Sequence, residues 1–256
     1  MTYPGMVAET VTFAGFGGDT IEAYYARPAA AGRYPSVVVI HHLPGWDNWT
    51  CEVVRKLAHG GYEAVAPHLY SRAPVGPADD MAARVRAMGG VSDEQAMGDI
   101  AASAKFLRAQ PGASGKAGCI GFCSGGRHAY LAAALVDGLD AAVDCWGGGV
   151  IVTDPAHLSP QRPVAPIDYT ARIGCPLLGI FGNDDRSPSV DQVNETEAVL
   201  KREGKTYEFH RYDGAGHGFF AVDRTGYRPE QATDAWGKVF AFYDKHLSGT
   251  SSGREE

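Results

Sequence analysis

The stretch Gly121-Phe122-Cys123-Ser124-Gly125-Gly126 indicates how this chain folds. It follows a short, mainly apolar run over residues 115–120, which is typical of a buried strand. It precedes residues 127–136, which are rich in Ala and Leu and contain no Gly or Pro, so a helix is predicted there. A Gly-x-Cys-x-Gly turn between a strand and a helix is typical of a nucleophile elbow, a sharp turn that lifts one side chain above a parallel sheet. An ordinary glycine-rich turn is the alternative, so the motif is informative only if an acid and a histidine accompany it.

The glycines of this stretch have a steric explanation. A strained turn brings neighbouring backbone segments close together, so a Cβ atom at Gly121 or Gly125 is expected to clash with them. The residue at the tip of such a turn is usually Ser, whereas this chain has Cys123. The predicted nucleophile is therefore a thiol.

Two further predicted strands lead to an acid and a histidine. Residues 177–181 run into Gly182-Asn183-Asp184-Asp185, and residues 206–212 run into Gly214-Ala215-Gly216-His217. The carboxyl ends of parallel strands lie along one edge of a sheet, so these groups should come close to Cys123. The two aspartates could instead serve only to cap the turn that follows them. The pattern gives no role to three other histidines, His68, His128 and His157.

The order Cys123, Asp185, His217 matches the nucleophile, acid, base order of the α/β-hydrolases. In those proteins the acid commonly lies three residues after such a glycine, which favours Asp185 over Asp184. His217 would accept or share the thiol proton and so raise the thiolate fraction. The carboxylate of Asp185 would hold the histidine tautomer and stabilise the imidazolium.

A loop after another buried strand is expected to complete the site. The β-branched run 37–40 is typical of a strand covered on both faces, and it leads into His41-His42-Leu43-Pro44-Gly45-Trp46. Negative charge on a substrate carbonyl oxygen needs fixed donors, and the backbone N–H groups of Ser124 and Leu43 are predicted to form this oxyanion hole. Thiolates expel alkoxide, enolate and thiolate groups better than amines, so lactones, esters and thioesters are expected rather than peptides.

Strands that alternate with helices predict an α/β fold with a mostly parallel sheet and helices on both faces. One domain is expected over residues 1–247, followed by a polar tail over 248–256. The irregular segment 67–91 is predicted to form a pocket wall, with a helical piece near 81–88. Further strands are expected at 7–13, 21–26, 62–66 and 141–146, and further helices from residue 48 or 50 to 59 and at 92–109, 191–203 and 229–246, with a loop at 28–35.

Composition limits the function classes. The 256 residues include 23 basic and 30 acidic side chains, so a net charge of −7 argues against non-specific nucleic-acid binding. Five cysteines, an odd count, favour reduced thiols, and no pair has zinc-site spacing. Neither a signal peptide nor an apolar run of transmembrane length is evident. The expectation is a cytoplasmic protein without a membrane partner.

The sequence resembles the dienelactone hydrolase family, the carboxymethylenebutenolidases, over residues 7–247. The elbow around Cys123 is the most specific match, and residues 178–185, 214–220 and 61–67 also match. The resemblance implies an α/β-hydrolase fold without a large lid, with Cys123 as nucleophile and Asp185 and His217 as its partners. It also implies a small lactone or ester substrate and no cofactor or metal. The chain is expected to be a monomer or homodimer.

Two positions depart from the family pattern. Three residues before Gly45 the family usually has a Glu that helps to activate the thiol, whereas this chain has His42. Either His42 takes part in activation or it only packs beside Trp46, and in the second case activation depends mainly on His217. Ala221 stands where a well-known member has an Arg that binds a substrate carboxylate. Replacements for that Arg, or else solvated charges, are Arg72, Arg84, Arg86 and Arg224.

The hypothesis is a cysteine-dependent hydrolase of lactone or activated ester bonds that forms a thioacyl-enzyme. Trp46, Phe122 and Phe219 are candidates for substrate contact, although aromatic residues near strand ends can equally belong to the core. A thioesterase or acyltransferase with the same triad is one alternative. A hydrolase-fold protein that only binds its ligand is the other.

Overall fold

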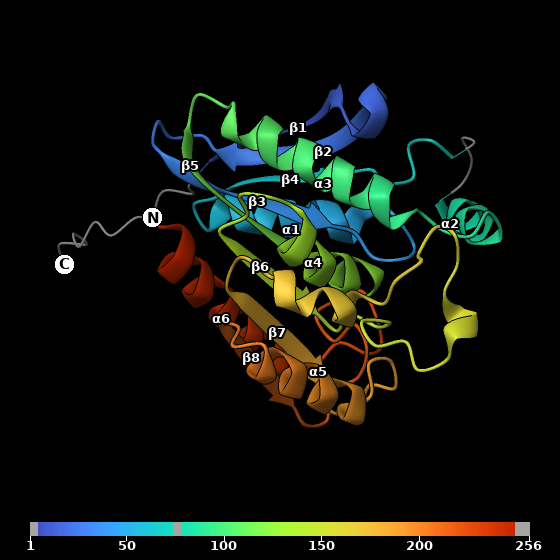
Figure 1. Ribbon diagram of the computed structural model, residues 1–256. Coiled ribbons are helices and arrows are strands. Elements are labelled where there is room, and N and C mark those ends of the chain that lie inside the picture. The colour runs from blue at the N-terminus through green and yellow to red at the C-terminus, as the bar shows by residue number, and fades with distance from the viewer. Residues whose placement is uncertain (1–4, 74–77, 249–256) are drawn as a thin grey trace.

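A computed structural model describes residues 5–73 and 78–248 of the chain. Its described strands form one eight-stranded sheet in the order β1-β2-β4-β3-β5-β6-β7-β8 (Figure 1). Neighbouring strands from β4 to β8 along this order run parallel, while β1 and β2 add an antiparallel edge. This is the expected α/β fold with a mostly parallel sheet. The strands are β1 (Met6–Ala14), β2 (Thr20–Pro28), β3 (Tyr34–Ile40), β4 (Glu63–Pro67), β5 (Ala113–Phe122), β6 (Ala141–Cys145), β7 (Leu177–Gly182) and β8 (Tyr207–Tyr212).

Helices cover both faces of the sheet, and the alternation of side chains along β3 explains why. Val37 and Val39 face α1 and α6, whereas Val38 and Ile40 face α3 and α4. All four side chains are fully buried, and each contributes about 1.5–3 kcal/mol by leaving water. The helices are α1 (Asn48–His59), α2 (Ala78–Ala87), α3 (Asp93–Arg108), α4 (Ser124–Leu135), α5 (Val190–Arg202) and α6 (Pro229–Leu247).

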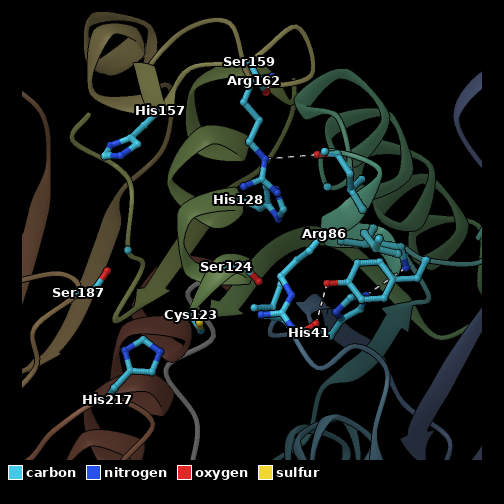
Figure 2. A pocket seen from close by; sticks show the side chains of 18 of the residues that line it. His41, Arg86, Cys123, Ser124, His128, His157, Ser159, Arg162, Ser187 and His217 are labelled. Atoms are coloured by element: carbon cyan, nitrogen blue, oxygen red, sulfur yellow. Dashed lines mark hydrogen bonds between the residues drawn. The ribbon is translucent and has the colours of Figure 1, made fainter. Parts of the chain in front are cut away.

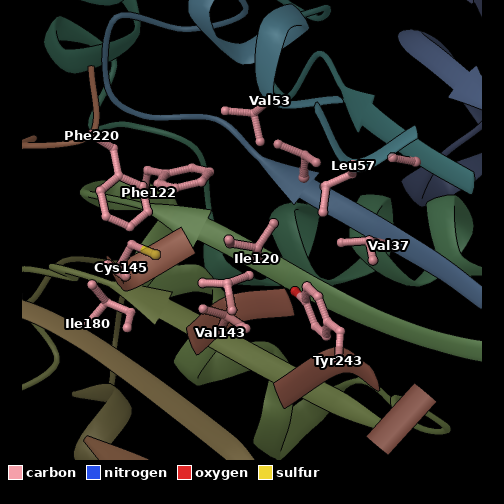
Figure 3. Packing of buried hydrophobic residues seen from close by; sticks show 14 of the residues in the cluster. Val37, Val53, Leu57, Ile120, Phe122, Val143, Cys145, Ile180, Phe220 and Tyr243 are labelled. Atoms are coloured by element: carbon pink, nitrogen blue, oxygen red, sulfur yellow. The ribbon is translucent and has the colours of Figure 1, made fainter. Parts of the chain in front are cut away.

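The core between the sheet, α1 and α6 is visible in Figure 3. Leu57 of α1 and Tyr243 of α6 approach Ile120 and Val143 of the central strands. Tyr243 is completely buried, and its hydroxyl donates to the carbonyl oxygen of Cys119 at 2.8 Å. The apolar stripe predicted for the last helix is therefore packed against the sheet, which anchors the end of the fold.

Two strand boundaries and one connecting segment differ from the sequence prediction. β5 is longer than residues 115–120 because it is paired on both sides, with β3 and β6, up to the elbow. β2 extends into the expected loop 28–35 because its pairing with β1 continues to Pro28. The segment after β6 contains two short 3₁₀ helices, η2 (Pro155–His157) and η3 (Pro166–Arg172). No periodic pattern in the sequence predicted them.

The described part of segment 67–91 contacts the loop that follows β3, where the Tyr70 hydroxyl donates to the Leu43 carbonyl oxygen. Leu69, Tyr70 and Val85 from this segment are buried against the core on the α3 side. Residues 74–77 of this segment lie outside the described residues, as do 1–4 and all of the expected tail except Ser248. Among the described helices, none has both the length and the apolar character required to cross a membrane.

Candidate active site

Cys123 lies at the tip of a strained turn between β5 and α4. Its φ of 56° and ψ of −118° are in a region that side-chain-bearing residues rarely adopt. A Cβ on Gly121 would lie 1.9 Å from the carbonyl oxygen of Gly125, and a Cβ on Gly125 would lie 2.2 Å from that of Ile40. The Cys123 N–H donates to the carbonyl oxygen of Cys145 at 3.1 Å. Both glycines are therefore needed for the turn to form.

Asp185 and His217 lie on the same edge of the sheet as the elbow. The Asp185 carboxylate follows β7, and its Oδ2 is 2.7 Å from Nδ1 of His217. Its other oxygen accepts a hydrogen bond from the Ser187 N–H at 2.9 Å. The Asp185 side chain is only 4% exposed, whereas Asp184 is exposed. The structure therefore brings Asp185, and not Asp184, to the histidine.

The imidazole of His217 lies beside Cys123 (Figure 2), and a side-chain hydrogen bond joins the two. Burial raises the pKa of the Cys123 thiol, but the hydrogen bond and charge of His217 outweigh burial and lower it. Burial lowers the pKa of His217, while hydrogen bonds to Asp185 and Cys123 raise it to about 10. These opposite shifts favour a thiolate beside an imidazolium at neutral pH.

Two backbone amides also point at the sulfur. The N–H groups of Ser124 and Leu43 donate hydrogen bonds to Cys123, and both lower its thiol pKa. Ser124 is the first residue of α4, so the partial positive charge of the helix N-terminus adds to the effect. Leu43 comes from the loop after β3. The two amides predicted to hold an oxyanion thus converge on the sulfur of Cys123 from different elements.

A cavity of about 750 Å³ opens above these groups. Cys123, Asp185 and His217 line it, and Cys123 and His217 lie next to each other in Figure 2. Val85 and Arg86 of α2 line another side, as expected for a pocket wall in segment 67–91. The remaining wall comes from α4 and from the segment after β6, through His128, His157, Ser159 and Arg162.

Comparison with known proteins agrees with this fold. The model of the dienelactone hydrolase family matches residues 21–247. The chain belongs to the dienelactone hydrolase family. A crystal structure from Klebsiella pneumoniae, provisionally titled a dienelactone hydrolase, superposes with a TM-score of 0.86 at 30% identity, covering 94% of this chain and 100% of that one.

Curated members of the family are similar over most of their length. A protein from Synechocystis sp., provisionally named carboxymethylenebutenolidase, is 31% identical over 89% of this chain and 92% of its own. A protein from Methylorubrum extorquens with the same provisional name is 34% identical over 86% of this chain and 75% of its own.

The structure does not bring His42, at the family's Glu position, to the sulfur. Its Nε2 is 2.6 Å from Oδ2 of Asp47, and its ring packs against Trp49 with centroids 5.3 Å apart. Asp47 caps α1 and is ionised, because hydrogen bonds from His42 and Thr50 overcome the effect of burial and lower its pKa to about 2. His42 is not among the residues that line the cavity. The packing alternative describes this residue better, with Trp49 in place of Trp46.

Of the three aromatic candidates for substrate contact, two belong to the core, and Trp46 is partly buried against it. Phe122 and Phe219 are fully buried in the cluster that packs against α1 and α6. Trp46 stacks on His68 with ring centroids 5.5 Å apart. None of the three lines the cavity. Phe122 is the last residue of β5, whereas Trp46 and Phe219 lie in the loops after β3 and β8. Aromatic residues at such positions can turn inward to fill the core instead of facing the ligand.

Of the four arginines proposed as replacements at the carboxylate site, only Arg86 lines the cavity. Arg72 forms ion pairs with Asp19 and Asp99, both at 2.8 Å, and is thereby held away from it. Ala221 is buried in the core. Arg162 and Arg186, which the sequence reasoning missed, also line the cavity. Arg162 lies in a segment without periodicity, so only the three-dimensional structure reveals its position.

His41 and Tyr70 fix the loop that carries Leu43, a role that the sequence analysis did not assign to them. The Leu69 N–H donates to Nε2 of His41 at 3.2 Å, so the ring proton is on Nδ1, which donates to the His42 carbonyl oxygen at 2.8 Å. Burial lowers the pKa of His41 to about 3, which keeps the ring neutral. The Tyr70 hydroxyl donates to the Leu43 carbonyl oxygen at 2.8 Å. His41 directly follows a fully buried strand, and this position in the sequence could have indicated that it supports the loop.

Residues 5–73 and 78–248 contain no group of three or more His, Cys, Asp or Glu side chains arranged to hold a metal ion. The chemistry proposed below uses only side chains and backbone groups of the chain.

Proposed function

We propose that this member of the dienelactone hydrolase family hydrolyses lactone or activated carboxylic ester bonds through a thioacyl-enzyme on Cys123. The observation that carries the proposal is the sulfur of Cys123, which receives hydrogen bonds from His217 and from two backbone amides at the tip of the elbow. The provisional name of the curated relatives, carboxymethylenebutenolidase, supports a lactone as substrate.

In the first half-reaction the thiolate attacks the carbonyl carbon of the substrate. The carbonyl oxygen becomes negatively charged and takes hydrogen bonds from the N–H groups of Leu43 and Ser124. The carbon–oxygen bond to the leaving group then breaks, and the imidazolium of His217 gives its Nε2 proton to the departing oxygen. In a lactone this oxygen stays attached to the acyl chain, so the ring opens on the enzyme.

In the second half-reaction water attacks the thioester carbonyl. The neutral His217 takes a proton from the water, and the same two amides bind the new oxyanion. The tetrahedral intermediate releases the carboxylic acid and the thiolate, which restores the thiolate–imidazolium pair. Asp185 keeps the Nδ1 proton of the histidine in place throughout and stabilises its charged form.

His217 is the main activator of the thiol in this proposal. A Glu beside the sulfur is missing, and His42 is hydrogen-bonded to Asp47 instead. The lowered pKa of Cys123 and the raised pKa of His217 supply the reactive state without a further base.

The test is Cys123→Ala assayed on para-nitrophenyl acetate and on a panel of small lactones and acyl-thioesters. We expect turnover to fall by at least a thousandfold, because the residue that forms the covalent intermediate is gone. Cys51→Ala is the matched control, since Cys51 is a half-buried thiol on α1 outside the cavity. Unchanged ester turnover by Cys123→Ala would disprove the mechanism. Faster turnover of thioesters than of lactones would reassign the substrate to the thioesterase alternative.

A further inference from the structure

A second cavity lies at the end of the sheet opposite the catalytic centre, and its volume is about 420 Å³. Its walls include the starts of three parallel strands, where Tyr34 begins β3, Glu63 begins β4 and Gly112 directly precedes β5 (Figure 1). Cys123 directly follows β5, whose 10 residues span about 30 Å at about 3.3 Å per residue. The cavity is therefore separate from the one that contains the thiol, and no step of the proposed hydrolysis uses it.

Glu63 brings an unpaired carboxylate to this cavity. The residue lines the cavity, and its exposed fraction is 0%, so it belongs to the inner surface. Neither of its carboxylate oxygens has a hydrogen-bond partner of ordinary length and angle. Within the described part of the chain, no basic side chain lies within ion-pair distance of it. A buried acceptor without a partner costs free energy, and a ligand that donates to it recovers that cost.

Arg27 lines the same cavity but does not neutralise Glu63. Its Nη1 donates instead to the Pro28 carbonyl oxygen at 3.1 Å. Burial raises the pKa of Glu63, and the charge of Arg27 and the hydroxyl of Tyr25 offset this effect only in part. The groups present therefore leave the ionised carboxylate poorly stabilised, and a cation beside it would favour that form.

The space beside Gly112 indicates where a donor group fits. A Cβ on Gly112 would lie 2.5 Å from Oε1 of Glu63 and 3.5 Å from the Gly32 carbonyl oxygen. Two acceptor atoms thus approach one position that glycine leaves open. Glu9 also lines the cavity and adds a second carboxylate. Acceptors and negative charge predominate around this position, which suits a cation that carries N–H groups.

Two tyrosines complete the walls, and neither adds a negative charge. The Tyr34 hydroxyl donates to the Ala30 carbonyl oxygen at 3.0 Å. Burial and the charge of Glu63 raise the pKa of Tyr25, so its hydroxyl keeps its proton at neutral pH. Aromatic rings attract cations, and flat cations such as guanidinium more often than ammonium. The tyrosines therefore favour the same kind of ligand as the carboxylate does.

We propose that this cavity binds a small organic cation with a guanidinium or amidinium group, which donates two N–H groups to the carboxylate of Glu63. Two free oxygens on one carboxylate match the planar fork of such a group better than they match the point charge of an ammonium. The volume is in the range of sites that enclose a whole small molecule. A metal ion fits less well, because the described residues contain no group of three or more His, Cys, Asp or Glu side chains arranged to hold one.

The test compares two ligands of nearly equal shape. Ethylguanidinium chloride and N-ethylurea have the same number of heavy atoms, but only the first carries a charge and a fork of donors. Isothermal titration calorimetry at constant ionic strength should show that the wild-type protein binds ethylguanidinium at least about tenfold more tightly. In amide NMR spectra, ethylguanidinium should shift the signals of Glu63 and Gly112 and leave that of Ser124 unchanged, which places the ligand in this cavity.

Glu63→Gln should weaken the binding of ethylguanidinium at least about tenfold, because the amide keeps the shape of the side chain and loses its charge. Glu195→Gln is the matched control, since Glu195 is an exposed carboxylate on α5, and it should leave the affinity unchanged. Cys123→Ala should also bind with the affinity of the wild type, because the two sites lie at opposite ends of β5.

Three results would overturn the site. The first is equal affinity of the wild type for ethylguanidinium and ethylurea, and the second is a Glu63→Gln variant that binds as tightly as the wild type. The third is a shift at Ser124 in place of Gly112, since the ligand would then lie in the catalytic cavity. The comparison of the two ligands decides the matter even if the variant does not fold. Ester turnover plays no part in these measurements, so this site and the proposed hydrolase function can fail independently.

Discussion

The charge state of two side chains determines how the elbow can work. A lone thiol is mostly protonated at neutral pH, and a lone imidazole is mostly neutral. Contact between Cys123 and His217 shifts both toward their charged forms, because each charge stabilises the other and Asp185 supports the imidazolium. With a pKa of about 10, the imidazole of His217 holds its proton at neutral pH.

A pH profile tests this arrangement. The imidazolium must donate to the leaving group, and it loses its proton above a pKa of about 10, so kcat/KM should fall above that pH. Asp185→Asn removes the carboxylate that raises this pKa, so the alkaline limb should move to lower pH and kcat should drop by about 10²–10⁴. Initial rates on a neutral nitrophenyl ester from pH 6 to 11 locate the alkaline limb of the wild type and of the variant. An Asp185→Asn profile with the wild-type alkaline limb would contradict the assignment.

At the level of elements, the elbow depends on backbone segments that pass at contact distance. β3, β5 and the first turn of α4 meet where Gly121 and Gly125 lack side chains, so the strand-to-helix connection can be this tight. The loop after β3 is held separately by His41 and Tyr70. Two independent supports thus bring the amides of Leu43 and Ser124 to one point.

Gly125→Ala should destabilise the protein by about 1–3 kcal/mol and remove activity, because its Cβ would overlap the Ile40 carbonyl oxygen. Gly237→Ala is the matched control. Gly237 lies inside α6, and no atom comes within 4 Å of the position that its Cβ would take, so alanine there should stabilise by up to about 1 kcal/mol. Urea unfolding of the two variants measures both effects. Equal stabilities for the Gly125→Ala and Gly237→Ala variants would contradict the close contact between Gly125 and the Ile40 carbonyl oxygen.

Prediction from sequence succeeded where the pattern is local. The β-branched run Val37–Ile40 and the glycines around Cys123 have physical requirements that few other structures satisfy, so fold and elbow could be anticipated. The position of Arg162 depends on how an aperiodic connection after β6 folds over the sheet, and no sequence period encodes that. The sequence fits the aromatic residues at strand ends equally well to the core and to the substrate pocket. Only the packing of the folded chain distinguishes the two positions.

At the level of the whole molecule, a buried carboxylate makes stability depend on pH. Asp144 of β6 is 2% exposed, and its one hydrogen bond comes from the Gly147 N–H at 2.8 Å. Burial raises its pKa to about 7 despite that hydrogen bond. The folded protein therefore holds this proton more tightly than the unfolded chain, whose carboxyl has the ordinary pKa of 3.8.

The sign of the effect follows from proton binding. Between about pH 4 and 7 the folded state binds more protons at Asp144, so this group's contribution to stability falls as pH rises through that window and stays low above it. Asp144→Asn removes the titration and keeps an acceptor for Gly147. Its stability relative to the wild type should increase from pH 4.5 to pH 8 in urea unfolding. A difference that is constant with pH would refute the buried, protonated carboxyl.

The backbone at Cys123 would accept an oxygen in place of the sulfur without moving, because φ and ψ concern only atoms up to Cβ. Thiol and alcohol side chains therefore fit the same turn, and they differ in bond length, nucleophilicity and proton affinity. A hydroxyl at that place would stay protonated at neutral pH, so the imidazole of His217 would keep Asp185 as a neighbouring anion and have no thiolate beside it. The backbone conformation is compatible with either atom, and the difference between them lies in the charges beside the turn.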